Sequence, residues 1–541
     1  MDFQRLFLVV IFSFSALLLW DGWQRYQHPE LHAAAVPEIA KRDDSAPAPT
    51  KVASATDSNK VGGLAADVHG KKIIVKTDNL HVEINTIGGD IQRVELLQHK
   101  DAQDKNKPVV LLQQKTEHIY IAQTGLLGSG LPTHQTPFTA TADEYRLADG
   151  ENTLIVRLVS GAVTKTLTFH RGSYLVDVGY EIENTGTQQL TASAYFQLVR
   201  DSSVPPGDSV LVPTYTGPAV YTEQEKFQKV EFSSIEKNKT TFPKTANNGW
   251  VAMLQHYFVA AWLPQGNVAR ENYVRALGEQ RYSVGTVIPV AAIAPGQKGE
   301  IKVPLYVGPA SANLDQIAPG LGLTVDYGWL TIIAAPLFWL LTFIHTWVQN
   351  WGVAIVVLTI LIKLAFFPLS AASYRSMAKM RIVAPKLEKI KQQYGDDREK
   401  LNRAMMDLYK TEKINPLGGC LPVLIQIPVF IALYWAILSS VELRYAPFFG
   451  WITDLSVADP YYVLPAIMGI SMLIQSRLNP TPPDPLQAKL MQIMPVVFSV
   501  VFFFFPAGLV LYSIVNNVLS IAQQWYITRN QEMEQKGAVK G

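Results

Sequence analysis

Cysteine is almost absent from this 541-residue chain, which contains only Cys420. A single thiol excludes an intrachain disulfide, and because Cys420 lies in an apolar stretch we interpret it as a buried, inert residue. The sequence also lacks a Gly-x-x-x-x-Gly-Lys phosphate loop, a His-Glu-x-x-His zinc motif and paired cysteines. We therefore expect no enzyme activity, no catalytic residue, no metal and no cofactor.

Charge is nearly balanced overall but unevenly distributed. The chain has 47 Lys and Arg against 45 Asp and Glu, yet its C-terminal third is strongly apolar while its middle resembles a soluble domain. The length exceeds what one ordinary core requires, so we expect two or three folding units.

The N-terminus resembles an uncleaved signal sequence. A basic flank precedes an apolar run from Leu6 to Trp20, and no small-residue cleavage site follows it. We predict a signal-anchor span over residues 1–28, with its N-terminus in the cytoplasm. Residues 29–71 are rich in Ala, Pro and Ser and show no sustained period, which indicates a flexible linker.

Residues 72–310 show a different pattern. Short β-branched and aromatic runs, such as Thr153–Leu158 and Tyr174–Val178, alternate with turn residues, such as Gly88-Gly89. Many short strands separated by turns are typical of a large antiparallel sandwich. Because it follows the anchor, we place this domain outside the cytoplasm.

Long hydrophobic runs begin after Tyr327. They cover residues 329–348, 351–369, 421–438, 461–476 and 490–525. A membrane span needs about 20 residues. The last run is therefore long enough for two crossings, and Pro506-Ala507-Gly508 provides a turn in its middle.

The distribution of Lys and Arg decides which runs cross. The segment from Arg375 to Lys413 contains eleven basic and six acidic residues, and a short loop so rich in Lys and Arg belongs in the cytoplasm. If both of the first two runs crossed, this loop would lie outside. We therefore assign 351–369 as a span and residues 311–350 as a linker with an interfacial amphipathic helix. The result is six spans, with a core over 351–530 and a cytoplasmic tail over 531–541.

Lys363 is the most informative single residue. It lies within the apolar run from Val353 to Leu369, roughly 9 Å from the cytoplasmic end at about 1.5 Å per residue. A cation near the centre of a membrane helix costs roughly 2.5–3.5 kcal/mol, so we expect it to face a hydrated cavity or a partner. The alternative, snorkelling toward the headgroups, stays open.

Other polar residues support a cavity. Thr359 precedes Lys363 by four residues and shares its helix face. Gln426 lies at a similar depth in the next span, and the last span contains Tyr512 and Ser513 followed by Asn516-Asn517. Each could simply bridge packed helices. Together they predict a polar pocket, and because no carboxylate partner for Lys363 occurs in the other spans, we expect the pocket to be hydrated.

The basic loop at 372–413 forms a unit of its own. Apolar residues recur at spacings of three and four on both sides of Gly395-Asp396-Asp397, which predicts a helical hairpin. The hairpin is either a docking arm for an anionic surface, such as ribosomal RNA or lipid headgroups, or a solvated charged face that only sets topology. The candidate docking residues are Arg375, Lys379, Arg381, Lys386, Asp396 and Asp397.

Several motifs resemble the Gram-negative form of the YidC membrane protein insertase family. They are Met1-Asp2 with Gln4-Arg5, Ser376-Met377-Ala378-Lys379-Met380, Asn415-Pro416-Leu417-Gly418-Gly419-Cys420, Asp459-Pro460-Tyr461-Tyr462 and Pro506-Ala507-Gly508-Leu509-Val510-Leu511-Tyr512. The resemblance covers essentially the whole chain and is most specific in its last 200 residues.

This resemblance implies a periplasmic β-supersandwich, a five-helix core and a multi-pass inner-membrane location with both termini in the cytoplasm. It implies that nascent membrane proteins, the ribosome, the Sec translocon and the phospholipid bilayer are partners, and that DNA is not. The family's groove or client contacts correspond to Thr359, Lys363, Gln426, Tyr512 and Ser513. The family more often has arginine at the Lys363 position, and Ser513 stands where a second tyrosine is usual.

Two rival functions stay open from the sequence alone. A secondary transporter could use Lys363 as an anion site, although we find no inverted repeat. The sandwich could also be a membrane-anchored carbohydrate-binding protein.

Overall fold

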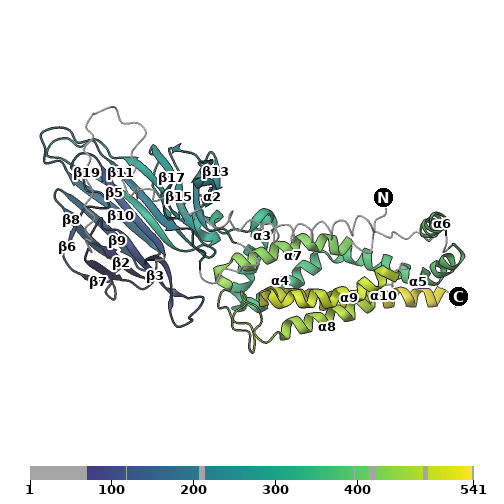
Figure 1. Cartoon of the computed structure of the whole chain (residues 1–541). Coiled ribbons are helices and arrows are strands. Elements are labelled where there is room, and N and C mark those ends of the chain that lie inside the picture. The colour runs from purple at the N-terminus through teal and green to yellow at the C-terminus, as the bar shows by residue number, and fades with distance from the viewer. Residues whose placement is uncertain are drawn as a thin grey trace.

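The computed structural model describes residues 70–538 except 117, 206–213, 395–396, 413–420 and 479–484. The predicted anchor 1–28, most of the linker 29–71, Asp396 and the last residues of the tail lie outside the described residues. A β-rich part lies at one end of the molecule and a bundle of helices extends from it (Figure 1).

The β-rich part is built from two sheets in the described part of the chain. The ten-stranded sheet has the order β14 (Thr245–Ala246), β17 (Arg270–Gly278), β18 (Arg281–Pro289), β11 (Ser193–Asp201), β5 (Ile119–Leu127), β4 (Pro108–Gln114), β3 (Ile91–Lys100), β2 (Leu80–Asn85), β1 (Lys72–Lys76) and β7 (Glu144–Arg146). The nine-stranded sheet has the order β13 (Lys226–Lys229), β12 (Gly217–Thr222), β15 (Trp250–Leu254), β16 (Phe258–Trp262), β19 (Lys298–Pro309), β10 (Leu175–Glu183), β9 (Val163–His170), β8 (Thr153–Ser160) and β6 (Thr139–Ala140). Pairing is antiparallel except between β1 and β7, which are parallel.

Alternating burial makes each strand two-faced. In β9 the residues Val163, Lys165, Leu167 and Phe169 are buried while their neighbours are not. Side chains on a strand alternate between faces, so this pattern turns one face of the sheet toward the sandwich core. Lys165 is a buried cation within that face, and its Nζ donates to the carbonyls of Gly88 and Gly89 at 2.9 and 2.8 Å.

The remaining elements are helical. They are α2 (Phe232–Glu236), η2 (Ala312–Gln316), η3 (Leu321–Thr324), η4 (Gly328–Leu330), α3 (Thr331–Val348), α4 (Trp351–Ala365), α5 (Phe367–Tyr394), α6 (Arg398–Thr411), α7 (Leu421–Ser439), η6 (Val441–Leu443), α8 (Val463–Leu478), α9 (Pro485–Val501), η7 (Phe502–Phe504) and α10 (Ala507–Ala538). The α5–α6 hairpin and the C-terminal end of α10 lie at the end of the bundle farthest from the sandwich (Figure 1).

The predicted span 351–369 is not one straight helix. Helix α4 ends at Ala365, and α5 begins at Phe367 after a bend of 67°. Pro368 explains this break, because proline lacks an N–H, clashes with the preceding turn of a helix and disfavours helical geometry in the residue before it. The first turn of a new helix tolerates proline, which is where Pro368 lies.

The number of membrane crossings stays a prediction, because few of the described helices meet the length criterion for a span. Within the described residues α3 is the one helix that is long and apolar enough to cross a membrane by itself, and α4 with α5 meets the same criterion only as a bent pair. The long run 490–525 does divide at Pro506, where η7 ends and α10 begins.

The sandwich and the bundle are joined by an apolar cluster that is separate from the sandwich's own core. Residues of β12, β15 and β16 pack with residues of η3, α3, α4, α7 and α10. Polar contacts join the same two parts: His256 Nε2 contacts the carbonyl of Leu438 at 2.9 Å, and the Tyr445 hydroxyl donates to the carbonyl of Asp101 at 2.5 Å. The end of α7 is therefore fixed against the sandwich.

Candidate functional site

A row of polar side chains follows one side of α10. Ser513, Asn516, Ser520 and Gln524 occur at spacings of three and four, so they lie on one helix face. This face turns toward α4, α5, α7 and α8, because residues from all of these helices line cavities beside it. The periodicity of α10 thus places a polar stripe inside an otherwise apolar bundle.

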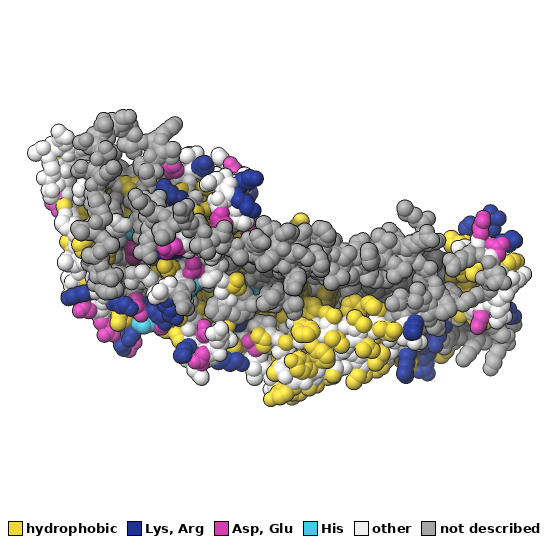
Figure 2. Space-filling view, viewed as in Figure 1, with side chains coloured by type: hydrophobic (Ala, Val, Ile, Leu, Met, Phe, Trp, Pro, Cys, Tyr) yellow, Lys and Arg dark blue, Asp and Glu magenta, His cyan; other side chains and the backbone are white. Residues whose placement is uncertain are grey.

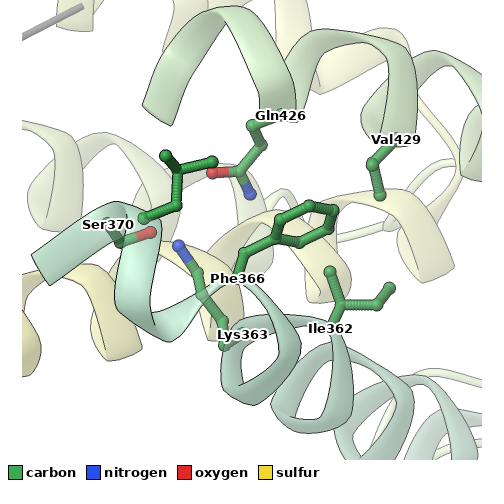
Figure 3. A pocket seen from close by; sticks show the side chains of 7 residues that line it. Ile362, Lys363, Phe366, Ser370, Gln426 and Val429 are labelled. Carbon is green, nitrogen blue, oxygen red and sulfur yellow. The ribbon is translucent and has the colours of Figure 1, made fainter. Parts of the chain in front are cut away.

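Lys363 extends from α4 into a small cavity next to this stripe. Ile362, Phe366 and Val429 form apolar walls, and Ser370 and Gln426 add polar groups (Figure 3). The ammonium end of Lys363 points toward Ser370 and Gln426 in this view.

The direct partner of Lys363 is a neutral hydroxyl. Its Nζ donates to Ser520 Oγ at 2.7 Å, and Ser520 Oγ donates in turn to the carbonyl of Asn516 at 2.7 Å. None of the ion pairs between described residues includes Lys363. The positive charge is therefore held by dipoles and left without a compensating carboxylate in this part of the chain.

Gln426 links α7 to α10. Its Nε2 donates to the hydroxyl of Tyr512 at 3.4 Å and to Oδ1 of Asn516. Tyr512 is only 1% exposed, so its ring is fixed in the core and only its hydroxyl reaches the polar side. These bonds hold a cation, two amides and a phenol from three helices in one region.

A larger, open groove of about 340 Å³ continues from this region. Its polar side includes Gln426, Asn516 and Ser520, and its apolar side is formed by Met377, Met468, Met472, Phe430 and Phe498. Methionine is flexible and polarisable, so such a wall adapts to apolar side chains of different shapes. One groove therefore offers both hydrogen-bonding groups and an adaptable apolar surface.

Two predicted residues contribute less directly. Thr359 is completely buried, its hydroxyl donates to the carbonyl of Ile355 at 2.7 Å, and it lines neither cavity. Ser513 lines the groove but also donates to its own helix, at the carbonyl of Leu509, 2.8 Å away. The structure brings Lys363, Gln426 and Tyr512 together, whereas Thr359 supports packing behind them.

Sequence reasoning missed Ser520 and Ser471. Ser520 holds Lys363, and Ser471 in α8 accepts a hydrogen bond from Asn517 Nδ2 at 2.8 Å. The three- and four-residue spacing after Ser513 could have indicated Ser520, because it continues the same helix face.

The hairpin presents its cations to solvent. Arg375, Lys379, Arg381 and Lys386 are exposed on α5, and only Lys386 among these four forms an ion pair with a described residue, at 2.6 Å to Glu412. Asp397 caps α6, accepting from the backbone N–H of Lys400 at 3.1 Å. Val383 and Leu387 pack against Met405 and Leu408, which holds the two arms together.

A hydrophobic surface covers the bundle between its two ends. Figure 2 shows hydrophobic side chains over the helices, with Lys and Arg gathered toward the end opposite the sandwich. On α8 and α9 the exposed apolar residues are Ile467, Ile470, Leu473, Ile474, Ile493, Val496, Val497, Phe498, Val500 and Val501. A contiguous patch of this kind marks contact with lipid or another apolar partner. Fold and site together define a membrane protein that carries a large soluble domain and a polar groove within its helices.

Comparisons with known proteins identify the family. A model of the YidC periplasmic domain matches residues 72–340, and a model of the 60 kDa inner membrane protein matches residues 343–536. The membrane protein insertase YidC of Nitrosospira multiformis is 55% identical over 98% of this chain and 97% of its own length. The corresponding protein of Aromatoleum aromaticum is 53% identical over 99% of this chain and 100% of its own. The chain belongs to the YidC family of membrane protein insertases.

A solved structure of an active YidC insertase with its first transmembrane domain resolved is 20% identical, with a TM-score of 0.40 over 84% of this chain and 92% of that one. The predicted family, the insertase function and the class of non-enzymatic proteins are confirmed by the relatives. The predicted fold is confirmed at the level of a large periplasmic β-sandwich followed by a helical membrane part. The transporter and carbohydrate-binding alternatives are set aside.

Proposed function

We propose that this protein inserts client chains by holding their polar segments in the groove beside Lys363 while their apolar segments move into lipid. The observation that supports this proposal is that Lys363, Gln426 and Asn516, from three helices, come together beside a groove with one polar and one apolar side. A polar client segment there keeps hydrogen-bonding partners part-way across the membrane. Burial of the apolar segment in lipid is favourable by itself, so no nucleotide is required.

Lys363 supplies charge and hydration in this mechanism. A carboxylate at the centre of a membrane helix costs roughly 2.5–3.5 kcal/mol, so a client with an acidic external segment meets a barrier of that size or more. A cation 4 Å away in surroundings of intermediate dielectric contributes about 4 kcal/mol of attraction, which is enough to offset a barrier of roughly 2.5–3.5 kcal/mol. Because Ser520 leaves the charge of Lys363 uncompensated, that charge is available to the client.

The proposed topology has six crossings with both termini in the cytoplasm. The sandwich is periplasmic, and the hairpin and the C-terminal end of α10 lie at the opposite end of the bundle. Helix α3 lies in the outer interface, as its two faces suggest: Ile332, Trp339 and Trp347 are 89%, 68% and 78% exposed, while Phe338 and Leu341 are buried. Tryptophan favours the membrane–water interface.

The hairpin is proposed to dock anionic surfaces. Arg375, Lys379 and Arg381 are exposed and make no ion pair with another described residue, which leaves their charges available to ribosomal RNA or to anionic headgroups. Ribosomes and the Sec translocon are the proposed partners of the cytoplasmic and membrane parts, respectively.

Insertion of a small single- or double-spanning client into proteoliposomes tests the groove. Protease protection is compared for wild type, Lys363→Arg, Lys363→Glu and Lys363→Leu, with Lys489→Leu, an exposed lysine at the start of α9, as the matched control. We expect activity with Arg and with the control, and loss with Leu and Glu. An inactive wild type would refute autonomous insertion, and full activity of all three Lys363 variants would show that Lys363 merely snorkels.

A further inference from the structure

A second, larger cavity lies between the sandwich and the periplasmic ends of α7 and α9. Its volume is about 830 Å³, which falls within the range of pockets that hold one small ligand. Residues of both parts of the chain line it, including the segment after β3, strand β4, the loop after η6, and η7. It shares no lining residue with the cavity around Lys363.

The walls of this cavity differ in polarity. Val500, Val501 and Phe504, from the end of α9 and from η7, are 50%, 42% and 68% exposed and form an apolar wall. Gln113 and Lys115, at the end of β4 and just beyond it, belong to the polar wall. The cavity therefore suits an amphiphile, with its apolar part toward the membrane helices.

Arg444 supplies a fixed cation to this cavity. Its guanidinium lies 5.5, 5.8 and 5.3 Å from the ring centroids of Tyr257, Phe258 and Tyr445. Aromatic faces hold a cation in place without neutralising its charge. Neither Arg444 nor Lys115 forms an ion pair with any residue that the structure describes.

The acidic side chains of the lining, Asp101 and Asp454, accept hydrogen bonds from residues of their own loops. Asp101 Oδ1 accepts from the backbone N–H groups of Gln103 and Asp104 at 2.8 and 3.1 Å. Asp454 Oδ1 accepts from the N–H and the hydroxyl of Ser456 at 2.9 and 2.7 Å. One oxygen of each carboxylate is therefore bonded within its own loop, whereas Arg444 and Lys115 have no ion-pair partner among the described residues.

We propose that this cavity binds an anionic phospholipid of the outer leaflet. The phosphate contacts Arg444 and Lys115, and the acyl chains lie along Val500 and Phe504. The inference rests on the proposed orientation, which puts η7 at the outer membrane surface. An extended client peptide fits less well, because β4 is paired with β3 on one side and with β5 at Gln113 and Gln114 on the other, which leaves only a short open edge before Gln113.

The test is lipid capture by the full-length protein in a neutral detergent. A benzophenone amino acid replaces Gln113 in β4, away from the lipid-facing helix surfaces, and is photoactivated with phosphatidylglycerol or phosphatidylcholine. Mass spectrometry should show adducts with phosphatidylglycerol in clear excess. Equal adducts with both lipids, or adducts with a client peptide alone when both are supplied, would overturn the proposal.

Charge variants give the second measurement. Native mass spectrometry of phosphatidylglycerol binding should show about a tenfold weaker affinity for Arg444→Gln, equivalent to about 1.4 kcal/mol. Lys115→Gln, at an exposed position where folding is not at risk, should weaken binding too, and Arg444→Lys should restore part of it. The matched control is Arg477→Gln, which removes an exposed cation near the C-terminal end of α8 that does not line the cavity. Affinity unchanged in both glutamine variants would refute the site.

Client insertion by Lys363→Leu is measured in parallel, after this variant is reconstituted into proteoliposomes. If phosphatidylglycerol binding fails while Lys363→Leu still loses insertion, only the lipid site is wrong. If binding depends on Arg444 while Lys363→Leu inserts normally, only the groove mechanism is wrong.

Discussion

The contact between Lys363 and Ser520 provides a quantitative test of whether the groove is hydrated. Nζ and Oγ are 2.7 Å apart, and Ser520 is 4% exposed. A hydrogen bond to a charged group in a dry site contributes about 1.5–3 kcal/mol. Because Lys363 is only partly buried beside an open groove, water can replace the lost hydroxyl, and we expect a coupling energy of about 1 kcal/mol or less.

A double-mutant cycle isolates this term. Lys363→Met, Ser520→Ala and the double variant are unfolded with an anionic detergent in mixed micelles, and tryptophan fluorescence follows the helical part. The coupling energy is the change in unfolding free energy of the double variant minus the sum of the changes of the two single variants. Ser476→Ala, which removes a hydroxyl bonded only to its own helix at the carbonyl of Leu473, is the control for the loss of a helical serine.

The size of the coupling energy decides between two descriptions of the groove. A value near 3 kcal/mol would refute the hydrated groove and indicate a closed, dry cation site. Full client insertion by Ser520→Ala is the second expectation, because charge and water, not this hydroxyl, carry the proposed mechanism.

Three further predictions concern stability. Gln426→Leu should destabilise the helical part by about 1–3 kcal/mol in the same titration, because Tyr512 and Asn516 lose their shared donor, whereas Ile427→Leu at the exposed neighbouring position should have little effect. Gly88→Ala should lower the unfolding free energy of the sandwich by more than 2 kcal/mol, since Gly88 has φ +70° and a Cβ would lie 2.3 Å from the carbonyl oxygen of His134. Gly161→Ala, with φ +58° and open space around the Cβ, should cost only the strain of the left-handed backbone conformation, about 1–2 kcal/mol. Equal losses in the two variants would contradict the clash at Gly88. Burial lowers the pKa of Lys165 below its ordinary value of 10.5, so the folded protein binds fewer protons than the unfolded chain as the pH approaches 10.5. The unfolding free energy of the sandwich should therefore rise with pH in this range, by at most about 1.4 kcal/mol per pH unit. Lys165→Met should lack this rise when thermal unfolding is measured at several pH values.

Much of the fold follows from local pattern. Alternating residues in β9 and turn residues such as Gly88-Gly89 indicate strands and their connections, and Pro506 marks where α10 must begin. These features depend on side-chain period and backbone freedom within a few residues, which the sequence states directly. The bend after Ala365 was not predicted, although Pro368 provided the signal, because the apolar run continues through it and hydropathy does not detect backbone geometry.

The sequence by itself determined the family, the periplasmic sandwich and the placement of one cation within an apolar run. Only the tertiary structure decided what surrounds that cation. Ser520 meets Lys363 across 157 positions of sequence because of the rotation and relative depth of α4 and α10, and Thr359 is turned into the packing by the same rotation. Likewise, Arg444 gains Tyr257 and Phe258 as neighbours only because the sandwich docks on the end of α7. Local periodicity fixes which face of a helix is polar, whereas the packing of all helices and sheets together fixes what that face meets.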